Sequence, residues 1–383
     1  MVPVPGPSRP LPPPDKVFVH GAGRCGECHN KMFDEWEVSA HARAVSSGTY
    51  QAAVADAGKA GCGDKCHAPL TAATGKDGVA SEGVTCDVCH TMRDPKPSAE
   101  GGEFTLAIDD MVKYGPRCDL KDHYFHRMGC SKVHQQAEVC GSCHWWEPKG
   151  VPVFTEYKDW RDGPAATKGT QCQGCHMPEE KAALAQGAPV RTGVAHHGLL
   201  GIAGDLRTRM IGGSVSVAVA ADGSLDAEVH VKNMTAGHYI PAGLPERRIQ
   251  VTFVVQDATG VTTDVQTIQL GRQLVDDKGA LAPFWRATKL GKDTRIAPGA
   301  EWVQTFAVEP DARGGEIVVS IDYLGLDPAI AKLLDVGERE ETQLVQWHVP
   351  FGAKQGAGRA KLPAKVSFTP PLAGARTLAT KKK

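Results

Sequence analysis

All twelve cysteines of this 383-residue chain lie in its first half, and ten of them form five pairs that are each followed at once by a histidine. Four pairs are separated by two residues and one pair by three. The five motifs are Cys25-Gly-Glu-Cys28-His29, Cys62-Gly-Asp-Lys-Cys66-His67, Cys86-Asp-Val-Cys89-His90, Cys140-Gly-Ser-Cys143-His144 and Cys172-Gln-Gly-Cys175-His176. Because the chain has 15 histidines in total, chance does not explain five such coincidences.

The chemistry of this spacing is covalent haem attachment. Two thiols form thioethers to the vinyl groups of one haem, and the adjacent histidine binds the iron as its proximal ligand. The motifs therefore predict five haems of the c type. Structural zinc is the alternative, but a zinc ribbon has no need for a histidine directly after each cysteine pair. The wider Cys62/Cys66 pair has a second alternative, a small disulfide or a degraded site, which would leave four haems.

Cys118 and Cys130 lack the following histidine. Haem c is attached outside the bacterial cytoplasm, where thiols oxidise. We therefore expect a disulfide between them that stabilises the fold by about 3 kcal/mol; the alternative is two unpaired buried thiols. The same reasoning predicts a periplasmic or extracellular protein, although a secretory signal is not recognisable in the sequence.

Charge and hydropathy narrow the classes of partner. The formal net charge is -1, with 43 Lys and Arg against 44 Asp and Glu, so no basic excess is available for nucleic acid. No apolar run approaches the length of about 18 residues that predicts a transmembrane helix. The propionates of five haems would make the protein more acidic, which predicts redox partner proteins with a basic face.

Composition changes along the chain predict an α+β multidomain protein. Residues 1–15 are rich in proline and predict a disordered lead-in. Residues 16–206 are poor in aliphatic side chains, so we expect an irregular, mainly α pentahaem cytochrome c domain whose haems supply the apolar core. Residues 207–351 predict an all-β sandwich of immunoglobulin type, and 352–383 a flexible tail. The predicted strands cover 214–221, 226–234, 248–257, 263–274, 302–308, 316–324 and 344–350.

A low-spin haem needs a second axial ligand, and ten histidines lie outside the motifs. The stretch 31–45 lacks Gly and Pro and predicts a helix with His41 at the edge of its apolar stripe. We expect at least two ligands among His123, His126 and His134, and one of His196 and His197, the other being a hydrogen-bonding neighbour. His20 is equally compatible with a ligand and a solvated loop. His230 and His348 have the pattern of surface residues on strands.

Four short patterns, within roughly residues 18–202, resemble the multihaem cytochromes c related to the tetrahaem electron carriers that serve hydroxylamine oxidoreductase. They are Trp36-x-x-Ser39-x-His41, Cys66-His67-Ala68-Pro69, Glu82-Gly83-Val84-Thr85 and Cys175-His176-Met177-Pro178. The resemblance implies that His41 ligates a neighbouring haem, and it supports His134 and His197 as distal ligands. The segment from Asn233 to Pro241 resembles a pattern in the β-domain appended to some members, which implies that His238 could reach a haem.

The favoured distal ligands are therefore His41, His126, His134, His197 and His238, with His20, His123 and His196 in reserve. A chain of haems with two histidine ligands each predicts an electron carrier between redox partners. One alternative is an oxidoreductase in which an open haem acts on a nitrogen or sulfur oxide. Another is a subunit of a cytochrome filament or of a membrane redox complex.

Overall fold

The computed structural model describes residues 19–58, 63–75, 78–108, 111–201, 206–219, 224–309, 314–336, 341–351 and 366–368. The chain divides into two compact units. The N-terminal unit is Met1–Gly204 with Leu334–Val336, and the C-terminal unit is Asp205–Leu333 with Gly337–Lys383. The predicted lead-in over 1–15, Cys62 and most of the predicted tail lie outside the described residues.

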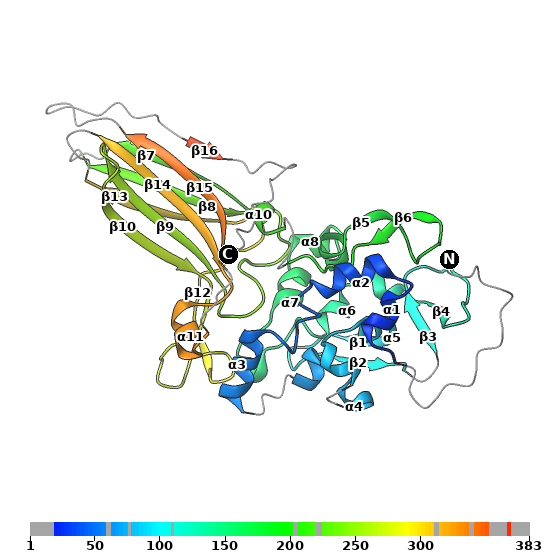
Figure 1. Ribbon diagram of the computed structural model, residues 1–383. Coiled ribbons are helices and arrows are strands. Elements are labelled where there is room, and N and C mark those ends of the chain that lie inside the picture. The colour runs from blue at the N-terminus through cyan, green and yellow to red at the C-terminus, as the bar shows by residue number, and fades with distance from the viewer. Residues whose placement is uncertain are drawn as a thin grey trace. The chain divides into compact units, whose positions relative to one another are not determined.

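The N-terminal unit consists of short helices joined by loops (Figure 1). Its longest described helix, α3 (Gly48–Ala57), has 10 residues. The other helices and helical turns are α1 (Ala22–Gly26), α2 (Asn30–Glu37), η1 (Gly63–His67), α4 (Thr71–Thr74), η2 (Val79–Glu82), α5 (Cys86–Thr91), η3 (Lys132–Gln135), α6 (Glu138–Gly141), η4 (Pro148–Gly150), α7 (Glu156–Arg161), α8 (Pro164–Thr167) and α9 (Cys172–His176). Within the described part of the chain, no helix has the length and apolar character needed to cross a membrane.

Three two-stranded sheets also belong to this unit, so its structure is mixed rather than mainly α as the sequence predicted. They are β1 (Met92–Lys96) with β2 (Glu103–Leu106), β3 (Val112–Gly115) with β4 (Arg127–Cys130), and β5 (Glu179–Ala183) with β6 (Val190–Ala195). The β3 and β4 strands are parallel, and the other two pairs are antiparallel. These strands were missed because each has only four to six residues, too few for a periodic pattern to stand out in the sequence.

The helix predicted over 31–45 is too long. Helix α2 ends at Glu37, and His41 lies in the turn that follows. The hydroxyl of Ser39 accepts a hydrogen bond from the Ala42 N–H at 3.3 Å. Serine competes with the helix in this way because its side chain replaces a backbone acceptor.

The C-terminal unit contains two four-stranded antiparallel sheets with the strand orders β10-β9-β14-β15 and β13-β8-β7-β16. The strands are β7 (Ile211–Val219), β8 (Leu225–Asn233), β9 (Arg248–Asp257), β10 (Thr262–Leu270), β13 (Glu301–Val308), β14 (Gly315–Leu324), β15 (Glu341–Phe351) and β16 (Val366–Phe368). A smaller sheet pairs β11 (Arg272–Val275) with β12 (Lys289–Asp293), and the helices are α10 (Leu206–Met210) and α11 (Pro328–Leu333).

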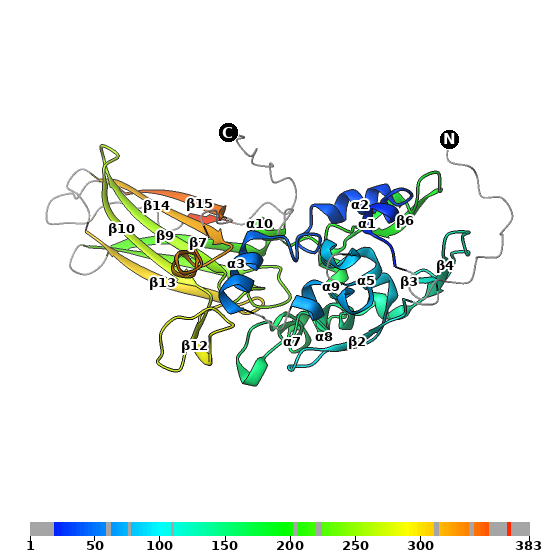
Figure 2. The same ribbon diagram turned by 60° about the horizontal axis from the view of Figure 1, so that its bottom comes forward.

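One apolar core joins the two large sheets, which form two layers in Figure 2. Burial alternates along β8 and β9, as expected for strands with one buried face. Phe253 of β9 and Phe306 of β13 stack across the core with ring centres 4.3 Å apart. The core cluster contains 23 buried residues of the described chain.

Most predicted strands overlap observed ones, with three differences. The strand predicted over 263–274 is divided at Gly271 into β10 and β11. Strand β12 was missed because all five of its residues are exposed and give no alternating pattern. Strand β16, at 366–368, lies in the segment predicted to be a flexible tail and pairs with β7.

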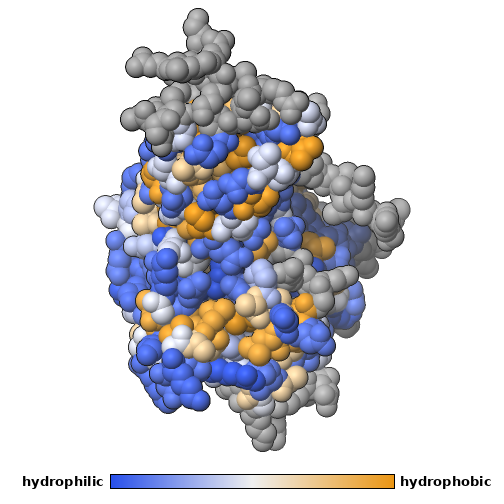
Figure 3. Space-filling view, turned by 90° about the vertical axis from the view of Figure 1, so that its left-hand side faces the viewer, coloured by the Kyte–Doolittle hydropathy of each residue, from blue (hydrophilic) through white to orange (hydrophobic). Residues whose placement is uncertain are grey.

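The surface of the molecule has separate apolar patches. On the face seen in Figure 3, hydrophobic residues alternate with hydrophilic ones. The edge strands contribute exposed apolar side chains, including Val265 of β10 at 56% and Val303 of β13 at 45% exposure. Isolated exposed valines of this kind are ordinary for a protein surface.

Candidate haem-attachment site

Four of the five motifs form helical turns. In the first and fourth motifs the histidine N–H donates to the carbonyl of the first cysteine, from His29 to Cys25 and from His144 to Cys140, both at 2.9 Å. The third motif lies in α5 and the fifth forms α9. Residues three apart lie on one face of a helix, so each motif directs its two thiols to the same side.

The wider second motif lies on a π-helical turn, η1. The Ala68 N–H donates to the Gly63 carbonyl at 2.8 Å, which spans five residues. A π-turn accommodates one extra residue within a helical turn, and this turn covers the described part of the motif, Gly63–His67. The described part of the motif therefore keeps a helical geometry.

Four proximal histidines are oriented by backbone carbonyls. The Nδ1–H groups of His29, His67 and His90 donate to Leu184 at 2.5 Å, Ala44 at 2.7 Å and Tyr114 at 2.7 Å, and His176 donates to Leu200. A metal-binding histidine usually donates its second ring nitrogen to a carbonyl or carboxylate. In each of these residues Nε2 is the nitrogen left for an iron.

Three proximal histidines face a second imidazole from a distant part of the chain. The ring centres are 6.3 Å apart for His29 and His126, 6.2 Å for His90 and His197, and 6.2 Å for His144 and His41. Two imidazoles that bind one metal ion from opposite sides, each through a bond of about 2 Å, have ring centres roughly 6 Å apart. The donor set therefore fits a haem iron between two histidines.

The half-buried imidazoles of His41 and His90 are held in their neutral form. Burial, with His144 next to it, lowers the pKa of His41 to about 4. Burial, with His197 beside it, lowers the pKa of His90 to about 3. Since neutral imidazole is the form that binds metals, these environments suit axial ligands.

Two of the sequence patterns meet at His41. The indole N–H of Trp36 donates to the Val84 carbonyl at 2.9 Å, and the Val84 N–H donates to the His41 carbonyl at 3.1 Å. Gly83 has a φ of 84°, and a Cβ atom there would lie 2.5 Å from the His41 oxygen. Only glycine allows this approach, so the Trp36 and Gly83 patterns together position the backbone of His41.

Glu35 was not predicted as a site residue, although it holds His197 in place. Its carboxylate accepts the His197 N–H at 2.7 Å and also pairs with Lys31. Burial raises the pKa of Glu35, but the His197 N–H and Lys31 outweigh it, so the net shift is downward. The sequence signal for Glu35 was its spacing of four residues from Lys31 in α2, but such spacing is common on helices and does not indicate a site.

The remaining candidates have other contacts. His134 lies 6.1 Å from His90 by ring centres, and its Nε2–H donates to Cys89, while its Nδ1 is buried without a hydrogen-bond partner in the described structure. His196 accepts the Gly198 N–H and lies 3.6 Å from Glu35. His123 accepts the Phe125 N–H at 3.3 Å. The ring centre of His20 lies 5.1 Å from that of Phe125.

His238 belongs to the C-terminal unit. It lies in the loop after β8, where the side-chain amide of buried Asn233 donates to the His238 carbonyl at 3.0 Å. Its Nδ1–H donates to the Tyr239 carbonyl, also at 3.0 Å. The segment from Asn233 to Pro241 is therefore a turn held by hydrogen bonds. The assignment of His238 as an iron ligand stays a prediction.

Cysteines of different motifs are neighbours. The Cys25 thiol lies beside that of Cys86, Cys66 beside Cys143 and Cys140 beside Cys172, and each pair is close enough for one thiol to shift the pKa of the other. The first motif is therefore a neighbour of the third, and the fourth motif is a neighbour of the second and the fifth.

Cys118 and Cys130 form a disulfide with Cα atoms 4.7 Å apart.

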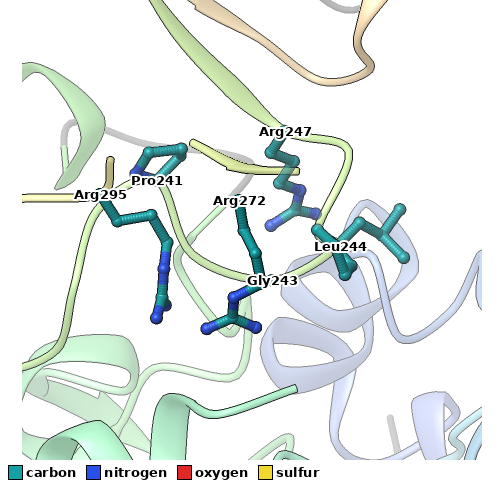
Figure 4. A pocket seen from close by; sticks show the side chains of 7 residues that line it. Pro241, Gly243, Leu244, Arg247, Arg272 and Arg295 are labelled. Carbon is teal, nitrogen blue, oxygen red and sulfur yellow. The ribbon is translucent and has the colours of Figure 1, made fainter. Parts of the chain in front are cut away.

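The C-terminal unit has a pocket whose lining contains neither cysteine nor histidine (Figure 4). It is lined by Pro241, Gly243, Leu244, Pro245, Arg247, Arg272 and Arg295. Asp293 pairs with Arg272 at 3.5 Å and with Arg295 at 3.0 Å. None of these lining residues belongs to a haem motif.

Comparisons with known proteins agree with the motif chemistry. A family described as "Cytochrome c554 and c-prime" matches residues 24–91, which contain the first three motifs. The matched segment and its three motifs therefore resemble a multihaem cytochrome of the c type. No curated protein matches this chain. Its fold is similar to that of a penta-haem cytochrome c552 from Thermochromatium tepidum, with a TM-score of 0.73 and 21% identity over 88% of this chain and 100% of that chain.

Proposed function

We propose that this cytochrome carries electrons between redox partner proteins through a chain of five haems, each held between two histidines. The observation that supports the proposal is the set of three imidazole pairs with ring centres 6.2 to 6.3 Å apart. Haem iron supplies one-electron chemistry, and its axial ligands and their hydrogen bonds set each potential. Two nitrogen ligands leave no position for a substrate, which favours transfer over catalysis.

The pairs suggest specific ligands for three haems. We assign His126 to the first, His197 to the third and His41 to the fourth. His197 is preferred to His134 for the third haem because its Nδ1–H donates to Ala195 at 2.8 Å and leaves Nε2 for the iron. For the second and fifth haems the predicted ligands are His20, His123, His134, His196 and His238.

The thiol contacts suggest an order of haems in space. The proximity of Cys25 and Cys86 supports an arrangement with the first attachment beside the third. The neighbours of Cys143 and Cys140 support the fourth attachment lying beside the second and the fifth. Cys89 interacts electrostatically with Cys140, which links the third attachment to the fourth. We propose that electrons from the first haem reach the fourth through the third, and that the path branches there.

We also propose a location and a domain type. Covalent haem attachment and the disulfide favour the periplasm or the cell surface. The C-terminal unit is proposed to be an immunoglobulin-type sandwich, with β7, β8 and β13 in one sheet and β9, β14 and β15 in the other. Strand β10 extends the second sheet.

Electron paramagnetic resonance of the oxidised holoprotein, with haem quantified in the same sample, tests the function. We expect five haems and only low-spin iron. His197→Ala should convert one iron to the high-spin state, and the control His348→Ala, at an exposed histidine of β15, should leave the spectrum unchanged. A wild-type high-spin signal that shifts with nitrite or hydroxylamine would contradict the carrier and favour the oxidoreductase alternative.

A further inference from the structure

The disulfide lies in the segment that carries the histidine facing the first proximal ligand. Cys130 ends β4, and Cys118 follows three residues after β3. The two strands pair in parallel over four residues, from Val112 opposite Arg127 to Gly115 opposite Cys130. A ribbon this small is marginal in stability by itself, so the covalent bond matters for keeping it together.

His126 depends on this ribbon for its position. It is the last residue before β4, and its ring makes an angle of 28° with that of His29 at a distance of 6.3 Å. Its Nδ1–H donates to the carbonyl of Arg127 at 3.2 Å. Because that acceptor belongs to the next residue, the bond orients the ring within the loop but does not attach the loop to another element.

The neighbouring side chain also contacts the first motif region. The ring of Phe125 lies 5.1 Å from His20, and the guanidinium of Arg24 in α1 lies 5.2 Å from its centre. These contacts guide the loop toward the first motif, but a cation over an aromatic ring at an exposed site is a weak interaction. A covalent bond that closes the loop restricts it far more strongly, because it limits the conformations available to the chain between Cys118 and Cys130.

We infer that the Cys118–Cys130 disulfide is a positioning element for the distal ligand of the first haem. It holds His126 opposite His29 by restricting the loop from Cys118 to Cys130. Without the disulfide, His126 no longer faces His29 in part of the molecules. In those molecules one iron becomes open to water or a small ligand. The inference rests on the proposed function, because it takes His29 and His126 to be ligands of one haem.

The test compares purified holoproteins with known haem content. His126→Ala should show a high-spin signal from one iron in five. Cys118→Ser/Cys130→Ser should show the same signal at lower intensity, because only part of the molecules lose the ligand. Lys121→Ala, an exposed position in the same loop, is the matched control and should keep all irons low-spin. A double variant with complete haem and only low-spin iron would overturn the inference, as would an unchanged spectrum for His126→Ala.

A second measurement covers failure of the double variant to mature. A water-soluble phosphine reduces the native disulfide: two electrons and two protons convert it to two thiols, and the phosphine takes an oxygen from water to become its oxide. The thiols are alkylated, the irons are reoxidised with ferricyanide, and the spectrum is recorded. High-spin iron supports the inference, and low-spin iron with both thiols alkylated overturns it. If the untreated wild-type protein already shows high-spin iron, that result contradicts the proposed function instead.

Discussion

The two units of the molecule bury apolar side chains to different extents. In the described residues, the C-terminal unit has one cluster of 23 buried residues, whereas the cluster around Leu70 in the N-terminal unit has five. The N-terminal unit instead has half-buried imidazoles and thiols, among them His41, His90 and Cys89. A unit with so small an apolar core needs another source of apolar surface, and haem attached to the motifs would supply it.

The largest effect should come from preventing haem attachment. In a host without cytochrome c maturation, we expect the N-terminal unit to remain unfolded and the C-terminal unit to fold, because only the latter has a complete core of side chains. Limited proteolysis should cleave within 19–201 and leave a fragment covering about residues 211–351. A protease-resistant fragment that contains the motifs without haem would show that the N-terminal unit folds without it, which contradicts this difference between the two units.

A change in the side-chain core should have the converse effect. Phe253→Ala removes one ring of the stacked pair with Phe306 and should destabilise the C-terminal unit by about 3–5 kcal/mol. Calorimetry of the holoprotein should show one transition at lower temperature, while the haem absorbance keeps its own transition. A simultaneous loss of haem absorbance at the lower temperature would show that the two units do not unfold separately.

A smaller change is expected at the contact between the Trp36 and Val84 segments. Trp36→Phe keeps the aromatic ring but removes the N–H donor to the Val84 carbonyl. Leaving a buried acceptor unpaired costs about 1–3 kcal/mol. The haem transition should move to lower temperature, with that of the C-terminal unit unchanged; the opposite pattern would contradict the local role of this bond.

The smallest effect is a pH dependence in the C-terminal unit. His230 lies 2.6 Å from Glu228 and 3.3 Å from Glu301. Burial lowers the pKa of His230, but the two carboxylates outweigh it and the net shift is upward. Its stabilising contribution is therefore present below the ordinary histidine pKa and is lost as the pH rises through the raised value.

The effect should be below about 1 kcal/mol, as for other surface ion pairs. Calorimetry at pH 5.5 and 8 should show a smaller difference for His230→Gln than for the wild type. An equal difference in both proteins would mean that other groups cause the pH dependence.

Local chemistry could be predicted from the sequence alone. Cys140, Cys143 and His144 lie within five residues, so their spacing predicts haem attachment without knowledge of the fold. The strands of the C-terminal unit could be predicted for a similar reason, since alternation along β8 and β9 is a property of neighbouring residues. The exposed strand β12 carried no such signal.

Which histidines face each other depends on the folded chain. The pairs His29 with His126 and His144 with His41 join residues about a hundred positions apart. Fifteen histidines allow many pairings, and no local pattern distinguishes among them. The positions of haem attachment can be predicted without the fold, because attachment depends on residues a few positions apart. The distance between rings depends on long-range packing, such as the bond from His197 to Glu35, and only the folded chain supplies that.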